Sequence, residues 1–247
     1  MTTTLTCRPS CVTDVVIRRV STTRAGGVSA PPYDSFNLGD HVGDDPEAVA
    51  ANRARLAKGL GLAPDHLVWM NQIHSAHVQR VDEPRTSAVD ATDALVTTTP
   101  GLALVVVTAD CVPVLLGDAR AGVVGAAHAG RVGAQNGVVV RTVEAMIEAG
   151  AHAEDISVLL GPAVSGANYE VPEAMAAEVE AALPGSRTLT ARRTPGLDLR
   201  AGIDRQLRAL GITAVAVDPR CTVADRTLFS HRRGAPTGRL ASVVWME

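Results

Sequence analysis

Several features that mark common protein classes are missing from this sequence of 247 residues. Its longest apolar run, Gly101 to Val107, is far too short to cross a bilayer. No run of Lys or Arg stands out and the net charge is -3, so nothing resembles a nucleic-acid or anionic-membrane footprint. The first residues have neither the charged nor the apolar segment of a signal peptide. We therefore expect a soluble, cytoplasmic protein without a nucleic-acid or membrane partner.

Paired cysteine motifs are also missing. The chain has 4 cysteines (Cys7, Cys11, Cys111 and Cys221), and in the cytoplasm these are thiols or ligands rather than disulfides. Cys7 and Cys11 fall in residues 1–14, which we expect to be disordered or loosely attached. No linker, repeat or low-complexity tract divides the rest, so residues 15–247 are expected to form one catalytic domain.

The apolar patterning predicts a mixed α+β fold. Short valine-rich runs predict strands at 15–20, 67–70, 78–81, 94–98, 103–108, 112–116, 123–127, 156–160, 214–217 and 241–246. Helices are predicted at about 46–59, 134–148, 172–183 and 198–210. Since residues 94–127 hold three strands with brief turns, we expect a layered α/β/α-type domain with mixed sheets. Neither a G-x-G-x-x-G motif nor a Walker loop is present, which argues against dinucleotide and P-loop chemistry.

Three local sequences could deliver functional groups to one surface. His74 follows Asn71-Gln72-Ile73 between candidate strands, Cys111 follows Asp110 where an apolar strand turns polar, and His128 ends another apolar strand. The glycine-containing loop and helix start after His128 could favour an anion. Each residue alone also has an ordinary structural interpretation, since isolated histidines are commonly hydrogen-bonded and isolated cysteines commonly belong to cores.

An ordered series of motifs along nearly the whole chain carries more information than any single residue. The series consists of Thr23-Arg24-Ala25-Gly26-Gly27-Val28-Ser29, Asn37-Leu38-Gly39, Gln72-Ile73-His74, Thr108-Ala109-Asp110-Cys111-Val112-Pro113, Ala127-His128-Ala129-Gly130, Gly161-Pro162-Ala163, Tyr169-Glu170-Val171, Cys221-Thr222, Phe229-Ser230-His231-Arg232-Arg233 and Thr237-Gly238-Arg239. Together they resemble the YfiH-type family of multicopper polyphenol oxidase or laccase-domain proteins. The resemblance implies a layered fold shared with certain cysteine hydrolases.

The resemblance also implies a metal site formed by His74, Cys111 and His128, and zinc is the expected ion. Three mixed N and S donors with an open fourth position are typical of a catalytic zinc site. Copper is possible but disfavoured, because a conventional multicopper oxidase needs about ten histidines and this chain has 7.

The activities that the resemblance implies are phosphorolysis of purine nucleosides (adenosine, inosine and methylthioadenosine) and deamination of adenosine. Candidate phosphate ligands are Arg24, Arg232 and Arg233, with surface ion pairing as the alternative role of Arg232. For deamination, Asp110 is the nearest carboxylate in sequence.

Three further residues are candidate contacts of the nucleoside. Asn37 and Gln72 could hydrogen-bond the sugar or base, and Phe229 could stack on the purine, although the core is the more common place for a phenylalanine.

Two departures from the family pattern bear on the pocket. The family usually continues His-Ala-Gly with Trp-Arg-Gly, whereas Arg131-Val132-Gly133 stands here, and family members often have tyrosine at the place of His231. The first departure puts the pocket wall and substrate choice in doubt but not the ligands. The partners expected are a nucleoside and phosphate, and the protein is expected to be a monomer or weak homodimer.

Two other functions stay open at this point. In one, Cys111 is a nucleophile and His128 its base in a hydrolase that edits peptidoglycan precursors. In the other, the protein is a non-catalytic partner of the cell-wall or division machinery.

Overall fold

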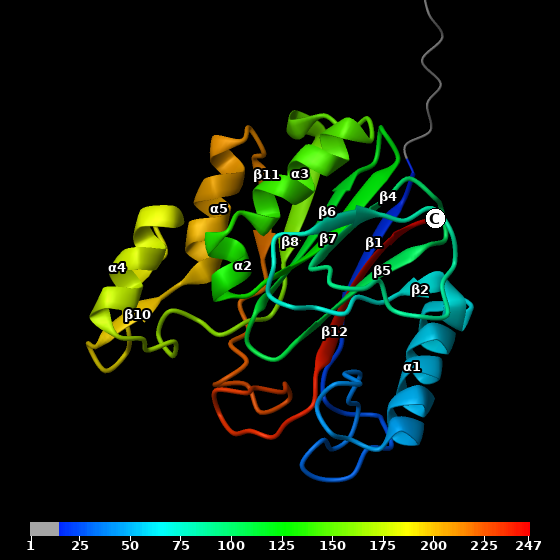
Figure 1. The fold of residues 1–247 in the computed structure, drawn as a ribbon, viewed down its shortest axis with the longest axis horizontal. Coiled ribbons are helices and arrows are strands. Elements are labelled where there is room, and N and C mark those ends of the chain that lie inside the picture. The colour runs from blue at the N-terminus through cyan, green and yellow to red at the C-terminus, as the bar shows by residue number, and fades with distance from the viewer. Residues whose placement is uncertain (1–14) are drawn as a thin grey trace, which may run out of the picture.

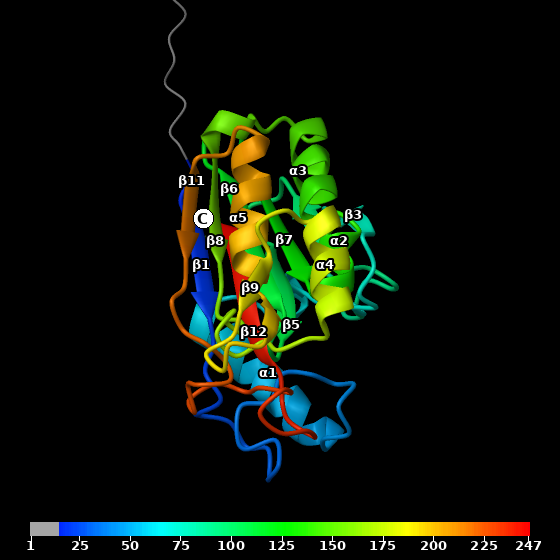
Figure 2. The same ribbon diagram turned by 90° about the vertical axis from the view of Figure 1, so that its left-hand side faces the viewer.

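The computed structural model describes residues 15–247, which form a sandwich of two packed sheets with helices on both outer faces (Figures 1 and 2). The expectations for residues 1–14, Cys7 and Cys11 included, lie outside the described residues. The mixed α/β single domain is confirmed. Its middle, however, is two stacked sheets rather than one, so the layers follow the order α/β/β/α.

Both sheets combine parallel and antiparallel strands. The larger sheet has the order β11 (Ala214–Val217), β8 (Ile156–Leu160), β6 (Val112–Asp118), β7 (Val123–Ala129), β4 (Ala94–Thr97) and β3 (Val78–Arg80). The smaller sheet has the order β1 (Ile17–Ser21), β12 (Leu240–Met246), β5 (Ala103–Thr108) and β2 (Leu67–Val68). A short hairpin pairs β9 (Arg187–Leu189) with β10 (Pro195–Leu197).

Alternation along the strands explains why the two sheets stack. On β5, Leu104 and Val106 pack between the sheets, whereas Ala103 and Val105 face the opposite way. Successive strand residues point to opposite faces, so a strand that is apolar at every position needs cover on both sides. In the smaller sheet that second cover is α1 (Pro46–Leu60).

The remaining helices cover the outer face of the larger sheet. They are α2 (Arg131–Gln135), α3 (Val138–Glu148), α4 (Glu173–Ala182) and α5 (Leu199–Ala209), grouped on one side of the molecule in Figure 1. Among them α3 and α5 contribute Val139, Val143, Ile203 and Leu207 to the apolar cluster above the sheet. No helix in the described part of the chain is long and apolar enough to cross a membrane.

All ten predicted strands are present, and no strand end differs from its predicted position by more than two residues. The helix expected over 134–148 is wrong in one respect, since it is divided into α2 and α3. Gly137 separates the two with a φ of 82°, a left-handed conformation that interrupts a right-handed helix. The hairpin of β9 and β10 was not predicted.

Candidate active site

The site lies at one end of the larger sheet, where β5 turns into β6. Because β6 and β7 are antiparallel, with Pro113 opposite His128, the turn that carries Cys111 lies beside the last residues of β7. Asp110 adopts a φ of 103° in this turn. Strand pairing therefore places Cys111 next to His128, although they are 17 positions apart (128 − 111).

The third side chain, His74, is positioned by hydrogen bonds from its loop to Asp93, the residue just before β4. The Asp93 carboxylate accepts backbone N–H groups from Ile73 (3.2 Å), His74 (3.0 Å) and Ser75 (2.6 Å). These bonds fix the loop between β2 and β3 while His74 adopts a φ of 60°. A single buried carboxylate thus holds the backbone of His74 against the larger sheet.

The two imidazoles and the thiol converge on one point. Their potential ligand atoms all lie within 4.8 Å of one another, and Cys111 Sγ is 3.9 Å from His74 Nε2. In a tetrahedral zinc site an S and an N ligand are about 3.5 Å apart, so a small contraction would suit the ion. His128 is buried, Cys111 is half-buried and His74 is exposed, so the cluster opens toward solvent.

Glycine at position 130 leaves the space that this cluster occupies. A Cβ atom at Gly130 would lie 2.7 Å from His74 Cδ2 and 3.0 Å from Cys111 Sγ. Both distances are too short for any other residue without displacement of a ligand. The donor set, its spacing and this cradle fit a metal ion.

Asp93 also orients the buried imidazole. Its Oδ1 lies 2.9 Å from His128 Nδ1, which leaves His128 Nε2 free to face the cluster. Burial raises the pKa of Asp93, but the bonds from His128 and Ser75 outweigh it and bring the pKa to about 2. The carboxylate is therefore ionised at neutral pH.

Cys111 and His128 shift each other's protonation. Burial raises the pKa of the Cys111 thiol, but the charge of His128, with help from His74, lowers it to about 6. Burial lowers the pKa of His128, but the Cys111 thiolate and Asp93 raise it to about 9. In the absence of a metal the pair is a thiolate and an imidazolium at neutral pH.

A cavity of about 330 Å³ opens beside the cluster. This volume is at the lower end of the roughly 300–1,000 Å³ typical of ligand pockets. Its lining includes the three clustered side chains, apolar groups and several cations: His41, Gln72, His74, Val107, Thr108, Ala109, Asp110, Cys111, His128, Arg131, Val164, Tyr169, Leu199, His231, Arg232 and Arg239.

Asp110, Gln72 and Arg232 reach the cavity as the sequence suggested. Asp110 accepts bonds from the Thr222 hydroxyl (2.6 Å), the Ser230 hydroxyl (2.7 Å) and the Arg232 N–H (2.6 Å). Gln72 bonds both the N–H and the carbonyl of Val107, each at 2.8 Å. Both side chains are held firmly by these protein contacts.

Arg24 and Arg233, the other candidate phosphate ligands, do not line the cavity. Arg24 forms an ion pair with Asp34 (2.9 Å) and lies over the Phe229 ring. The Arg233 guanidinium donates to backbone carbonyls, including that of Thr222 at 2.7 Å. Their guanidinium groups organise loops instead of facing a ligand.

Asn37 and Phe229 are likewise away from the cavity. Asn37 is fully buried and bonds Gly39, Asp44 and the Arg239 N–H. Phe229 is fully buried in an apolar cluster with Leu228 and Leu240. Neither is placed to contact a nucleoside, because the surrounding chain occupies their polar atoms or faces.

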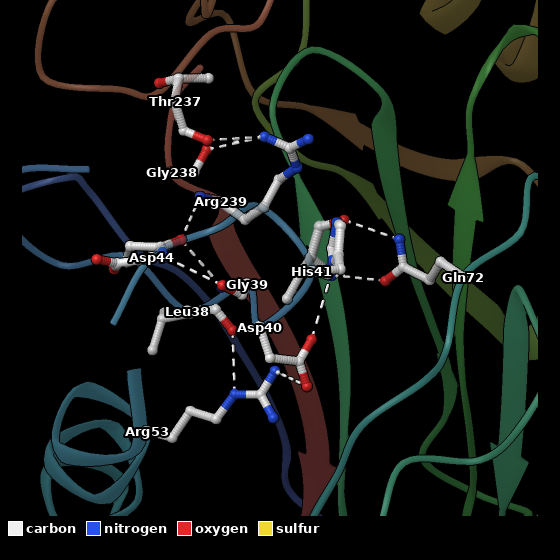
Figure 3. A network of polar contacts seen from close by, with 12 residues as sticks. Leu38, Gly39, Asp40, His41, Asp44, Arg53, Gln72, Thr237, Gly238 and Arg239 are labelled. Carbon is white, nitrogen blue, oxygen red and sulfur yellow. Dashed lines mark hydrogen bonds and ion pairs between the residues drawn. The ribbon is translucent and has the colours of Figure 1, made fainter. Parts of the chain in front are cut away.

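Several cavity residues were missed at the sequence level. Figure 3 shows His41 paired with Asp40 (Nδ1 to Oδ1 3.5 Å), which is in turn paired with Arg53 (3.1 Å). In the same view, Arg239 extends from the Thr237-Gly238 loop, and its Nη1 donates hydrogen bonds to the carbonyls of both residues. Arg239 belongs to a quoted motif, which could have suggested it, whereas nothing in the local sequence distinguishes His41.

Asp93 and Tyr169 were also missed. Asp93 looks in sequence like an ordinary acid ahead of a strand, and only the fold brings it to His128. Tyr169 belongs to a quoted motif, and its ring lies beneath the Arg232 guanidinium at 5.0 Å.

Residues 18–247 match the protein family described as multi-copper polyphenol oxidoreductase laccase. The chain is 72% identical over 233 residues to a purine nucleoside phosphorylase of Mycobacterium tuberculosis, covering 94% of this chain and 93% of that protein. It is 60% identical to a purine nucleoside phosphorylase of Corynebacterium glutamicum, covering 93% and 94% respectively. The crystal structure of the YfiH protein of Bacillus licheniformis superposes with a TM-score of 0.88 at 30% identity, covering 97% of this chain and 98% of that one.

Proposed function

The chain belongs to the multi-copper polyphenol oxidoreductase laccase family, and from that premise we propose that it is a zinc-dependent purine nucleoside phosphorylase of the cytoplasm. The names of the relatives in M. tuberculosis and C. glutamicum support this reaction. The observation that carries the proposal is the cluster of His74, Cys111 and His128 at a cavity whose wall also includes Arg131, Arg232 and Arg239.

Zinc suits this donor set better than copper. When bound, zinc would keep Cys111 as a thiolate and supply a Lewis acid to an atom of the substrate. Blue-copper centres use two histidines and a cysteine too, usually with a weak axial methionine, and no methionine lines the cavity. A laccase also needs a separate trinuclear centre, whereas the described residues contain this one group of three clustered ligands.

Phosphorolysis requires the cavity to hold a nucleoside and phosphate together. A phosphate oxygen forms a bond to C1′ of the ribose, the bond from C1′ to the purine nitrogen breaks, and its electron pair leaves with the base. The base then takes up a proton. His41 is our candidate donor, because it lines the cavity and its ring is oriented by Asp40.

The cavity also offers groups for binding the nucleoside. Thr108 is 2% exposed, and its hydroxyl has no hydrogen-bond partner in the described part of the protein. A buried hydroxyl without a partner is costly, and a ribose hydroxyl would satisfy it. Val107, Ala109, Val164 and Leu199 supply the apolar surface that a purine base requires.

Adenosine deamination remains a second proposed reaction of the same site. It requires a group that shuttles protons, and Asp110 is the one carboxylate on the cavity wall. Three hydrogen bonds engage the oxygens of Asp110. These bonds favour an orienting role for Asp110 and therefore favour phosphorolysis over deamination.

A hydrolase that needs no metal is a candidate function of a different class, and one observation favours it. Cys111, His128 and Asp93 stand in the order thiol, imidazole, carboxylate, which is the arrangement of a nucleophile, a base and the group that orients the base. Protein that contains no metal and loses activity on alkylation of Cys111 would support this function instead.

Product analysis distinguishes the reactions. Purified protein is incubated with adenosine, inosine or methylthioadenosine, with and without phosphate. We expect free base and a sugar phosphate only when phosphate is present. Inosine formed from adenosine without phosphate would indicate deamination, and no product under any condition would refute both nucleoside reactions.

A further inference from the structure

The cavity carries two arginines whose charge the protein does not neutralise. Arg131 is the first residue of α2 and Arg232 lies in the loop before β12, and both line the cavity. No ion pair joins either guanidinium to a carboxylate of residues 15–247. Arg131 is half-buried and Arg232 is exposed, so an anion that enters the cavity can reach both guanidiniums and pair with their N–H donors.

Arg232 is held in place while its donors stay available. Its backbone N–H donates to Asp110 Oδ2 at 2.6 Å, and its Nη1 donates to the Glu170 carbonyl at 3.2 Å. The guanidinium also lies 5.0 Å above the Tyr169 ring. A guanidinium has five N–H donors, so one bond to a neutral carbonyl leaves both charge and donors for a ligand.

Tyr169 lines the same cavity as Arg131 and Arg232. Burial and the Cys111 thiolate raise the pKa of the Tyr169 hydroxyl, while the charges of Arg131 and Arg232 both lower it. The two guanidiniums and the Tyr169 ring reach this cavity from three segments: α2, the loop before β12, and the loop between β8 and α4. Cys111 lines the same cavity, so these groups share it with the metal-ligand cluster.

The charges of the cavity wall favour a multivalent anion. Asp110 is the one carboxylate among the lining residues, against the three arginines Arg131, Arg232 and Arg239. Arg239 differs from the other two, because its guanidinium donates to the carbonyls of Thr237 and Gly238 in its own loop.

We propose that Arg131 and Arg232, together with the hydroxyl of Tyr169, form the phosphate subsite of this cavity. Arginine pairs present forked N–H donors that match the oxygens of a phosphate dianion, and the phenol adds one more donor. The subsite would hold phosphate beside the metal-ligand cluster for attack on the ribose. This assignment rests on the proposed phosphorolysis, and it replaces Arg24 and Arg233 as phosphate ligands.

Steady-state kinetics of the metal-loaded protein test the subsite. The variants are Arg131→Met, Arg232→Met and Tyr169→Phe. The matched control is Arg192→Met. Arg192 is exposed and lines a second groove, with Glu173 and Thr190, but it does not line this cavity. We expect the KM for phosphate to rise about 10- to 100-fold in each arginine variant and several-fold in Tyr169→Phe. The KM for the nucleoside should change less than about threefold, and the control should match the unaltered protein.

Two results would overturn the assignment. One is a phosphate KM within about threefold of normal in both arginine variants, and the other is a rise confined to the nucleoside KM. Calorimetric titration with inorganic phosphate separates this assignment from the proposed reaction. Phosphate binding that weakens in Arg131→Met and Arg232→Met supports the subsite even if no nucleoside is cleaved. Phosphorolysis that proceeds normally in both variants refutes the subsite alone.

Discussion

At the residue scale, the chemistry depends on the charge states of Cys111, His128 and Asp93. The pKa of each is set by burial and by its charged neighbours together, since Asp93 and His128 are buried and linked by a 2.9 Å bond. The shifts are measurable in metal-free protein, where no ion competes for the thiolate.

Alkylation of Cys111 in metal-free protein should therefore persist to unusually low pH. Because the pKa of the thiol is lowered to about 6, the thiolate is present above that pH and is lost as the pH falls through it. The rate of modification by iodoacetamide, followed on the peptide that carries Cys111, should be half-maximal near pH 6, against about 8.5 for an ordinary thiol. In His128→Asn the midpoint should move up toward the ordinary value. A midpoint near 8.5 in the unaltered protein would show that the two groups do not interact.

Asp93→Asn should weaken metal binding without removing a ligand. Asp93 accepts hydrogen bonds from His128 and from the backbone N–H groups of residues 73–75. An asparagine keeps one acceptor oxygen, but its NH₂ group would face some of these donors. Loss of such an orienting group costs about 10- to 100-fold in metal affinity. Competition with a chelator of known affinity measures the loss. The control is Asp90→Asn, whose exposed carboxylate accepts only from Asn71. Equal affinities in the two variants would contradict the role of Asp93.

Sequence patterns indicated the three clustered side chains more reliably than the residues expected to bind the substrate. Cys111 and His128 were identifiable because each interrupts or ends an apolar strand, and His74 because it lies between two candidate strands, all three within motifs of a known family. Asn37, Arg24 and Arg233 lie in equally distinctive motifs, yet their polar atoms bind the chain itself. A motif alone does not tell whether a polar group faces a ligand or a backbone carbonyl.

At the element scale, the site is assembled from strand ends. The antiparallel register of β6 and β7 brings Cys111 to His128, and Gly130, which follows β7, makes room for His74. The predicted strands were close to those observed because their apolar runs are continuous. The division between α2 and α3 was not predicted, because a single glycine is tolerated inside many helices and the left-handed φ of Gly137 is a property of the structure and not of the sequence.

Gly130→Ala should disrupt the cluster without unfolding the sheet. The added Cβ would lie 2.7 Å from His74 Cδ2, and His74, being exposed, is the side chain free to move away. We expect metal affinity to fall on the order of 10- to 100-fold, with the far-ultraviolet dichroism unchanged. Gly59→Ala is the matched control, because its Cβ in α1 meets nothing within 4 Å. That variant should bind metal normally and gain about 0.5–1 kcal/mol in stability. Normal metal affinity in Gly130→Ala would contradict the cradle.

At the scale of the whole molecule, the two stacked sheets carry most of the core. Strands apolar at every position predicted burial on both faces, yet the pattern could not tell whether helices or a second sheet provide the cover. From the sequence alone, Leu104 could pack against a helix or against a second sheet, and in the structure it packs between the two sheets. Which kind of cover forms depends on pairing between strands far apart in the chain, such as β1 with β12.

Leu104→Ala should accordingly lower the free energy of unfolding by about 2–5 kcal/mol. The side chain is 0% exposed, and the surrounding β-sheets limit relaxation around the cavity left behind. Val217→Ala on the edge strand β11, where the side chain is 45% exposed, should cost less than about 1 kcal/mol. Denaturant titration measures both, and equal costs would show that the intersheet layer is not a packed core.

Whether His74, Cys111 and His128 bind zinc can be measured as the metal content of protein purified without added metal. Elemental analysis should find about one zinc ion per chain in the unaltered protein and almost none in Cys111→Ala, whose fold is checked by circular dichroism. A folded protein without stoichiometric metal, one that holds copper instead, or a Cys111→Ala variant that keeps its zinc would each contradict the account.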